Sequence, residues 1–156
     1  MAAAPAHASI RAYRLSDWPR LCQIHDRARL DELQRSAGVD AFRTLARTAH
    51  SEGLFDGRLD VAEVDGVVRG FVAFQRASLD WLYVDPDSYR QGVGRALLRH
   101  AIALSGPTIS TQALLGNEPA IALYRSEGFV EIERRSGRLA GCDGAVAVGV
   151  ILELRR

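Results

Sequence analysis

Lysine is absent from the 156 residues, so all twenty basic side chains are arginines. No side-chain Schiff base can therefore form, which excludes a pyridoxal-phosphate enzyme. A Walker A loop and a protein kinase also need a lysine to contact nucleotide phosphates, and both are excluded for the same reason.

The net charge and the number of cysteines are also low. Twenty basic residues against nineteen acidic residues leave a net charge of +1, and no more than two basic residues are consecutive. The sequence therefore lacks the clustered positive charge that is typical of nucleic-acid-binding proteins. Cys22 and Cys142 show no Cys-x-x-Cys spacing and predict reduced thiols in a cytoplasmic protein. Cys22 shares a helix face with His25, but a third partner for thiol catalysis is missing. The four histidines lack ligand spacing, so we predict no metal site.

Long apolar runs are missing as well. The longest, Ala145–Leu152, has eight residues, whereas a membrane span needs about 20. The alanine-rich start lacks the basic and hydrophobic regions of a secretion signal, and we expect residues 1–8 to form a loose tail. Hydrophobic residues make up 47% and charged residues 25%, without repeats or linkers, so we predict one globular domain over residues 1–156.

The hydrophobic periodicity alternates between helical and strand spacing along the chain. This order predicts an α+β fold with an antiparallel meander in its first half. The predicted helices are Asp17–Leu33, Val39–His50, a helix that includes Ala96–Leu104, and Glu118–Glu127. The predicted strands are Ile10–Arg14, Leu59–Val64, Val67–Gln75, Leu79–Val84, Thr108–Ala113, Phe129–Arg134 and Val146–Leu154.

A glycine loop connects the third strand of the meander to the next helix. Gly92 and Gly94 allow a sharp turn, and the helix start that follows presents unpaired N–H groups, so the loop suits a phosphate. Arg90 and Arg95 flank it and offer charge-assisted contacts. A plain strand-to-helix turn is the alternative interpretation. A dinucleotide fingerprint needs a third glycine where this chain has Leu97, so a Rossmann fold is excluded.

A second motif, Asn117 to Phe129, follows the loop and includes the only asparagine of the chain. Together with the strand end Leu82-Tyr83-Val84-Asp85-Pro86 and the loop Gln91-Gly92-Val93-Gly94, it resembles the GNAT superfamily of N-acetyltransferases. The resemblance is specific over Val61 to Arg134. One departure is Tyr89, because the family usually has Arg or Gln three residues before the first motif glycine.

The resemblance implies a strongly bent mixed sheet of six to seven strands flanked by about four helices. The strands ending at Val84 and starting near Thr108 would diverge and admit the pantetheine arm of acetyl-CoA, the cosubstrate. Asn117 would contact cofactor or water, although an N-cap role explains it equally well. The cofactor would be bound by backbone groups of Leu82, Tyr83 and Val84 and by the loop residues Arg90, Gln91, Gly92, Val93, Gly94 and Arg95.

The resemblance also implies direct transfer of acetyl to an amine in a ternary complex. Tyr124 is the expected general acid for the leaving thiolate, since its ordinary pKa of about 10 keeps it protonated. On spacing alone, its ring would simply pack in the core. A backbone N–H near Leu82 or Tyr83 would stabilise the oxyanion.

The general base and the acceptor site are less clearly marked. Asp80 is the first candidate for the base, Glu63 is the second, and a water relay is the third. Alternatively, Asp80 and Glu63 have no catalytic role, and each is either solvated on a strand face or paired with an arginine. The acceptor, a small-molecule or peptide amine, would lie opposite the cofactor. Its site would be lined by Trp18, Asp31, Glu32 and Trp81.

Two other functions compete with this hypothesis. A non-catalytic acyl-CoA-binding regulatory module would keep the loop, but the presence of Tyr124 argues against it. A toxin that acetylates aminoacyl-tRNA is disfavoured by the near-zero net charge. The apolar last strand suggests a possible homodimer by analogy with the family.

Overall fold

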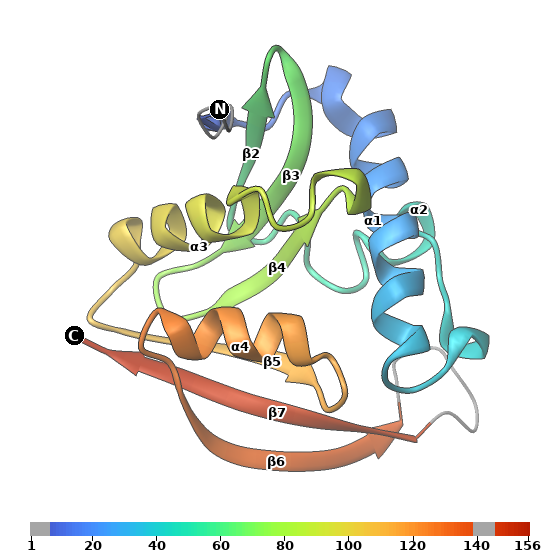
Figure 1. Cartoon of the computed structure of the whole chain (residues 1–156), viewed down its shortest axis with the longest axis vertical. Coiled ribbons are helices and arrows are strands. Elements are labelled where there is room, and N and C mark those ends of the chain that lie inside the picture. The colour runs from blue at the N-terminus through green and yellow to red at the C-terminus, as the bar shows by residue number, and fades with distance from the viewer. Residues whose placement is uncertain (1–6, 139–145) are drawn as a thin grey trace, which may run out of the picture.

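The computed structural model describes residues 7–138 and 146–156. Cys142 and most of the predicted tail lie outside these ranges. The helices are α1 (Trp18–Gln34), α2 (Leu45–Thr48), α3 (Val93–Leu104) and α4 (Glu118–Ser126), with 3-10 turns at Leu15–Asp17, Val39–Ala41 and Pro86–Ser88. The strands are β1 (Ser9–Ala12), β2 (Arg58–Val64), β3 (Val67–Phe74), β4 (Leu79–Val84), β5 (Thr108–Leu114), β6 (Val130–Arg138) and β7 (Val146–Arg155) (Figure 1).

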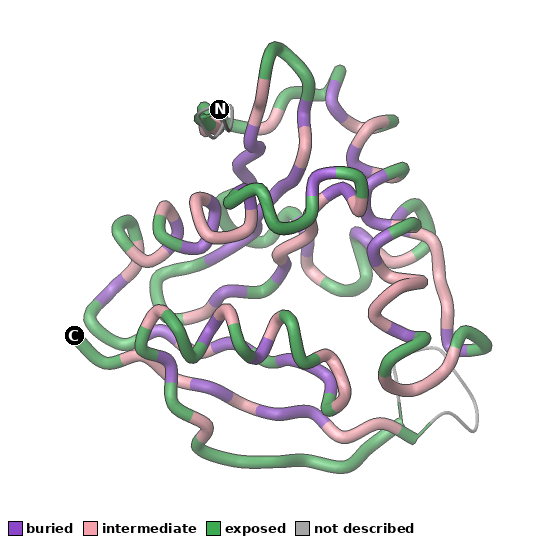
Figure 2. The backbone as a smooth tube through the Cα atoms, viewed as in Figure 1, coloured by how far each residue is buried: buried purple, intermediate pink, exposed green. Residues whose placement is uncertain are grey.

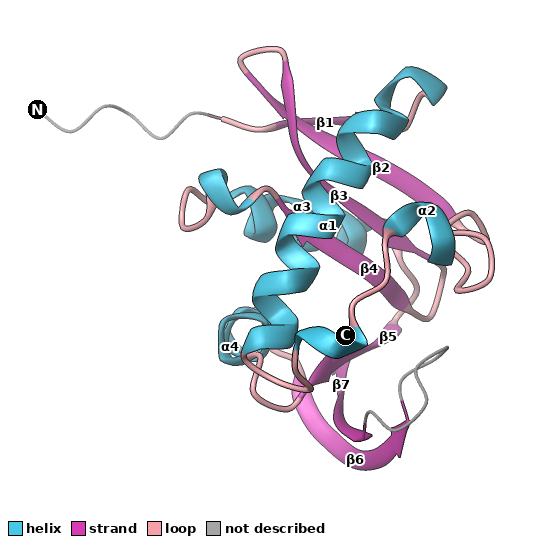
Figure 3. Cartoon of the chain, turned by 90° about the vertical axis from the view of Figure 1, so that its right-hand side faces the viewer, coloured by secondary structure: helices cyan, strands magenta, loops and turns pink. Residues whose placement is uncertain are grey.

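The strands form two antiparallel sheets that meet at one corner. One sheet has the order β1-β2-β3-β4 and the other β5-β7-β6. An isolated parallel bridge between Ser78 and Ser110 joins them, and the Thr111 hydroxyl donates to the Leu79 carbonyl at 3.0 Å. Beyond this corner β4 and β5 do not pair, so both expose an edge to the space between the sheets (Figures 1 and 3). The predicted bent sheet with diverging strands is confirmed.

The core lies on both faces of the first sheet. One cluster packs α3 and α4 against β2, β3 and the second sheet, and it includes Val72, Leu97 and Ile109. The other packs α1 and α2 against the opposite face, around Leu21 and Phe71. The buried stretches follow the strands and the inner faces of the helices (Figure 2). Strand β4 is thus covered on both faces, which fixes its position relative to α1 and α3.

The prediction of one continuous helix over Val39–His50 is wrong. The chain forms a 3-10 turn, becomes extended at Phe42 (ψ 132°) and at Thr44 (ψ 155°), and then makes the four-residue helix α2. The Asp26 carboxylate of α1 accepts the Leu45 N–H at 2.9 Å, so a tertiary contact starts this helix. The segment buries Ala41, Leu45 and Ala49 by wrapping around α1 instead of continuing as one helix.

Two smaller findings complete the fold. The strand predicted to end at Arg134 continues to Arg138, because β6 pairs with β7 along its whole length. No helix in the described part of the chain is long and apolar enough to cross a membrane.

Candidate active site

Two connected cavities lie between α1, β4, the glycine loop and α4. Each has a volume of about 460 Å³. The loop lobe is bounded by the glycine loop and the C-terminal half of α1, and the strand lobe by β4, β5 and the α1–α2 segment. The residues that line both lobes, and so mark their junction, are Glu32, Leu82, Tyr83, Asn117, Ala120 and Tyr124.

The glycine loop shapes one wall of the loop lobe. Gly92 has φ +84° and caps α3, a left-handed conformation that favours glycine. The helix makes its first bond from the Ala96 N–H to the Gly92 carbonyl at 3.0 Å. The N–H groups of Val93, Gly94 and Arg95 precede this bond and therefore have no helical acceptor. The lobe thus offers backbone donors and a positive dipole end to an anion such as a diphosphate.

The side chains of the loop differ in their availability. Arg90 and Arg95 line the lobe, but the Arg95 guanidinium also donates to the Ser126 hydroxyl at 2.9 Å and pairs with Glu127. The Gln91 amide turns back to the Asp87 carbonyl at 3.4 Å, and Gln91 does not line the lobe. Anion contacts therefore depend mainly on the backbone and on Arg90.

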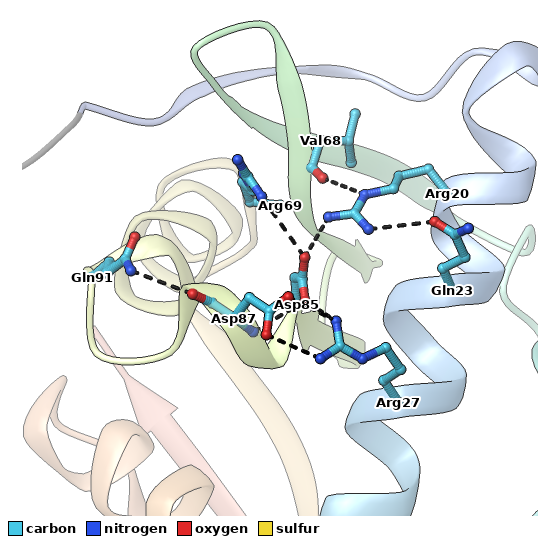
Figure 4. Close-up of polar contacts among 8 residues, drawn as sticks. All are labelled: Arg20, Gln23, Arg27, Val68, Arg69, Asp85, Asp87 and Gln91. Atoms are coloured by element: carbon cyan, nitrogen blue, oxygen red, sulfur yellow. Dashed lines mark hydrogen bonds and ion pairs between the residues drawn. The ribbon is translucent and has the colours of Figure 1, made fainter.

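A buried carboxylate that the sequence analysis missed anchors the loop to α1. Asp85 lies at the end of β4, and its carboxylate contacts Arg20 and, at 2.9 Å, Arg27, both on α1 (Figure 4). Arg69 of β3 lies 3.9 Å away. One Asp85 oxygen also accepts the Asp87 N–H at 3.1 Å, which starts the turn before the loop. Asp85 thus connects α1, β3 and the loop, and only the fold reveals this network.

Tyr124 occupies the junction of the two lobes. It is 5% exposed, and its ring packs on Phe129 with centroids 5.6 Å apart. Burial raises the pKa of its hydroxyl to about 12, against the opposing effect of a hydrogen bond with Thr111. The hydroxyl is therefore protonated at neutral pH and can donate a proton.

Asn117 also lies at the junction. It is the N-cap residue of α4, as the sequence predicts, but its side chain makes no capping hydrogen bond. The capping explanation for this asparagine is therefore wrong. Asn117 instead lines both lobes.

A polar cluster closes the junction on the α1 side. Glu32 pairs with Arg29 one turn earlier, and the Tyr83 hydroxyl of β4 makes hydrogen bonds with both. Burial raises the pKa of Glu32, although Arg29 opposes the shift. Burial and the nearby Glu32 charge also raise the pKa of Tyr83. Sequence reasoning missed Arg29; its three-residue spacing from Glu32 on a predicted helix is the signal that points to the pair.

His25 forms part of the wall of the strand lobe. It is 3% exposed, and its ring centroid lies 4.9 Å from that of Tyr83 and 5.9 Å from that of Trp81. Burial lowers the pKa of His25 although the Asp26 carboxylate, 2.9 Å from Nδ1, opposes this. The ring is therefore neutral at pH 7. Burial also raises the pKa of the neighbouring Cys22 thiol, which fits a structural cysteine.

The residues predicted for the base and the acceptor site lie at different places. Asp80 and Trp81 line the strand lobe, and Asp80 is exposed and accepts the Gln75 amide at 3.0 Å. Asp31 lines the loop lobe, where it bonds to the Tyr89 hydroxyl. Glu32 lies between the two lobes. These four residues surround one continuous space.

The structure does not bring the other two predicted residues to this space. Trp18 packs on Phe55, with ring centroids 6.0 Å apart, and lines neither lobe. Glu63 pairs with Arg11 at 2.8 Å between β1 and β2, and it lines neither lobe. Among the described residues, no group of three or more His, Cys, Asp or Glu is arranged to hold a metal ion.

Comparisons with known proteins agree with this geometry. The model of the acetyltransferase (GNAT) domain matches residues 55–131. The chain is 37% identical over 60 residues to the peptidyl-lysine N-acetyltransferase YjaB of Escherichia coli, covering 38% of this chain and 40% of that protein. It is 40% identical over 77 residues to the E. coli [ribosomal protein bS18]-alanine N-acetyltransferase, covering 47% and 52%. These matches thus span about half of the relatives' length or less.

The structural similarity covers more of the chain than the sequence similarity does. The crystal structure of the E. coli ribosomal-protein-S18-alanine N-acetyltransferase superposes with a TM-score of 0.67 at 27% identity and covers 96% of this chain and 94% of that one. The family motifs lie at the glycine loop and at α4, where the two lobes meet. Residues 55–131 of the chain thus match the GNAT family of acetyltransferases, and the fold of the described chain is that of a GNAT acetyltransferase.

Proposed function

We propose that the protein is an N-acetyltransferase that moves acetyl from acetyl-CoA to an amine by direct attack within a ternary complex. The observation that carries the proposal is the meeting of two cavities at Tyr124: one is lined by an anion-binding loop, and the other is open to a second substrate. A non-catalytic acyl-CoA-binding module would need only the first of them.

The loop lobe fits acetyl-CoA. The N–H groups at the start of α3 would hold the pyrophosphate, since they have no helical acceptor. Strand β4 is the edge of its sheet, so alternate backbone groups of Leu82, Tyr83 and Val84 face the space toward β5 and would hold the pantetheine arm. Asn117, whose amide is not used for capping, would contact the same arm or an ordered water. The thioester would then lie at the junction.

The junction residues would carry out the chemistry. Attack of the amine on the thioester carbonyl makes a tetrahedral oxyanion, and a free N–H of β4 near Leu82 or Tyr83 would stabilise it. As the C–S bond breaks, Tyr124 would protonate the departing sulfur. No covalent enzyme intermediate is required.

The acceptor would enter through the strand lobe, past Asp80 and Trp81. Two relatives are named for a peptidyl lysine and for an alanine of a ribosomal protein, so we propose a primary amine on a peptide or a small molecule. The reduced state expected for the Cys22 thiol is consistent with a cytoplasmic enzyme.

Calorimetric titration with acetyl-CoA, followed by a thiol-release assay, tests this proposal. The amine panel contains an alanine-terminated peptide, an N-acetylated peptide with one lysine, a polyamine and an amino acid. We expect micromolar binding and thiol release with at least one amine. Binding without thiol release would support the regulatory module instead, and absence of binding would exclude both functions.

The Asp85 network gives a specific prediction for cofactor affinity. Asp85→Asn removes the charge that holds Arg20 and Arg27 of α1 against the loop. We expect the KM for acetyl-CoA to rise about tenfold while kcat changes less than twofold, because the network orders the loop and lies outside the junction. Arg134→Gln, which breaks a surface pair with Glu131, is the control. A fall in kcat with unchanged KM would contradict the prediction.

A further inference from the structure

Glu32 combines two features that no other carboxylate of the two lobes has. Its side chain is only 16% exposed, and it lines both cavities, so it faces the place where the thioester and the acceptor amine would meet. Asp80, in contrast, is exposed and lines only the strand lobe, and Asp31 lines only the loop lobe. The Glu32 carboxylate is therefore within the shared space of both substrates.

The charged and titratable groups around Glu32 come from four elements. Arg29 on the same helix pairs with it, and Tyr83 of β4 is hydrogen-bonded to it. The Glu32 charge also acts on Tyr89 beside the glycine loop and on Tyr124 of α4. Farther along the strand lobe lie His25, which is neutral, and Glu52, whose pKa is raised by burial.

These contacts hold the carboxylate in place without using all of its acceptor sites. A carboxylate has about four lone-pair sites, and Arg29 and Tyr83 occupy part of them. Because Glu32 lines both lobes, we take the remaining sites to be open to a molecule bound at the junction. Because burial outweighs the effect of Arg29, the pKa of Glu32 lies above its ordinary value of 4.5, which makes the group a stronger base than a solvated glutamate.

On the assumption that the proposed acetyl transfer is correct, we infer that Glu32 is the general base that takes a proton from the ammonium group of the acceptor. An ammonium gives one proton to a Glu32 oxygen, and the freed lone pair forms the N–C bond with the thioester carbonyl. When the C–S bond breaks, Tyr124 gives its proton to sulfur and regains one from the amide nitrogen. Glu32 then releases its proton to water, so one proton leaves per turnover.

Glu32→Gln tests this role, since it keeps the shape of the side chain and removes the basic oxygen. We expect kcat to fall about 100-fold or more, as for loss of a general base. Acetyl-CoA affinity, measured by calorimetry, should stay within about threefold. Glu32→Asp should restore part of the activity. Glu131→Gln is the matched control, because Glu131 also pairs with an arginine three residues away, but lies outside both lobes.

The pH profile separates a base from a merely structural residue. In the wild type, kcat/KM should reach a plateau above the pKa of Glu32, which lies above 4.5. In Glu32→Gln, kcat/KM should instead rise about tenfold per pH unit up to the pKa of the free amine, about 10.4 for a lysine side chain. An unchanged profile in Glu32→Gln, or the same loss of the plateau in Asp80→Asn, would overturn the assignment.

Loss of Glu32 leaves Arg29 without its buried partner, so the single variant is paired with Arg29→Gln/Glu32→Gln, which removes both charges. The double variant should show the same altered pH profile. A wild-type protein that turns over no amine would remove the proposed function together with this role. A wild-type protein that turns over an amine, with an unchanged profile in both variants, would remove only the role of Glu32.

Discussion

Replacing Tyr124 by phenylalanine is expected to lower kcat for thiol release by about 100- to 1,000-fold and to leave acetyl-CoA affinity unchanged. The hydroxyl is the only part of the side chain that the substitution removes, and the ring still packs on Phe129. The loss therefore reports the proton that a positioned acid gives to the leaving thiolate. Steady-state thiol release and calorimetric titration with acetyl-CoA provide the two measurements.

Tyr13→Phe is a suitable control for Tyr124→Phe, because Tyr13 belongs to the core cluster on the other face of the sheet and lines neither lobe. It should leave kcat within about twofold. If Tyr124→Phe raised KM without lowering kcat, the hydroxyl would serve binding rather than proton transfer.

The pKa of Tyr124 gives this role a pH signature. An acid must be protonated to act, and burial keeps the pKa of the hydroxyl at about 12. The activity due to Tyr124 is therefore present below pH 12 and is lost only as the pH rises through that value. A wild-type kcat that is flat between about pH 7 and 10 agrees with this, whereas a decline near pH 9 would place the acid elsewhere.

The parts of the site that could be predicted are those encoded by neighbouring residues. The glycine loop works through the backbone of consecutive residues that begin a helix, and the motif from Asn117 to Tyr124 occupies the first two turns of α4. A short segment of sequence is enough to specify such features. The order of strands and helices could also be predicted, because a strand and a helix each have their own spacing of hydrophobic residues.

The parts that could not be predicted depend on how distant segments pack. Arg29 and Glu32 of α1 meet Tyr83, some fifty residues later, only because α1 covers β4. The Asp85 network likewise gathers arginines from α1 and β3. The break in the helix predicted over Val39–His50 follows from the Asp26 contact to Leu45. Apart from the three-residue spacing of Arg29 and Glu32 on one helix, these contacts leave no local signal, since burial and pairing are decided by the fold.

A negative charge at Gly94 is expected to weaken acetyl-CoA binding by about 100-fold or more. Gly94 lies in the first turn of α3, where the proposed site holds the pyrophosphate. A Cβ there would lie 3.5 Å from both Leu123 and Val84, an ordinary contact, so the fold accepts a side chain. In Gly94→Asp the new carboxylate would lie beside the N–H groups that hold the pyrophosphate and would repel the pyrophosphate charge. Calorimetric titration at low salt measures the loss, which corresponds to about 2.7 kcal/mol.

Gly94→Asn is the matched control, since asparagine has nearly the same size as aspartate and no charge. We expect it to weaken acetyl-CoA binding less than tenfold, and the difference between the two variants to shrink at high salt as the charges are screened. An acidic residue at a helix start stabilises the helix, so Gly94→Asp should not lower Tm relative to Gly94→Asn. Equal affinities of the two variants would show that the first turn of α3 does not contact the pyrophosphate, and the loop lobe would then need another ligand.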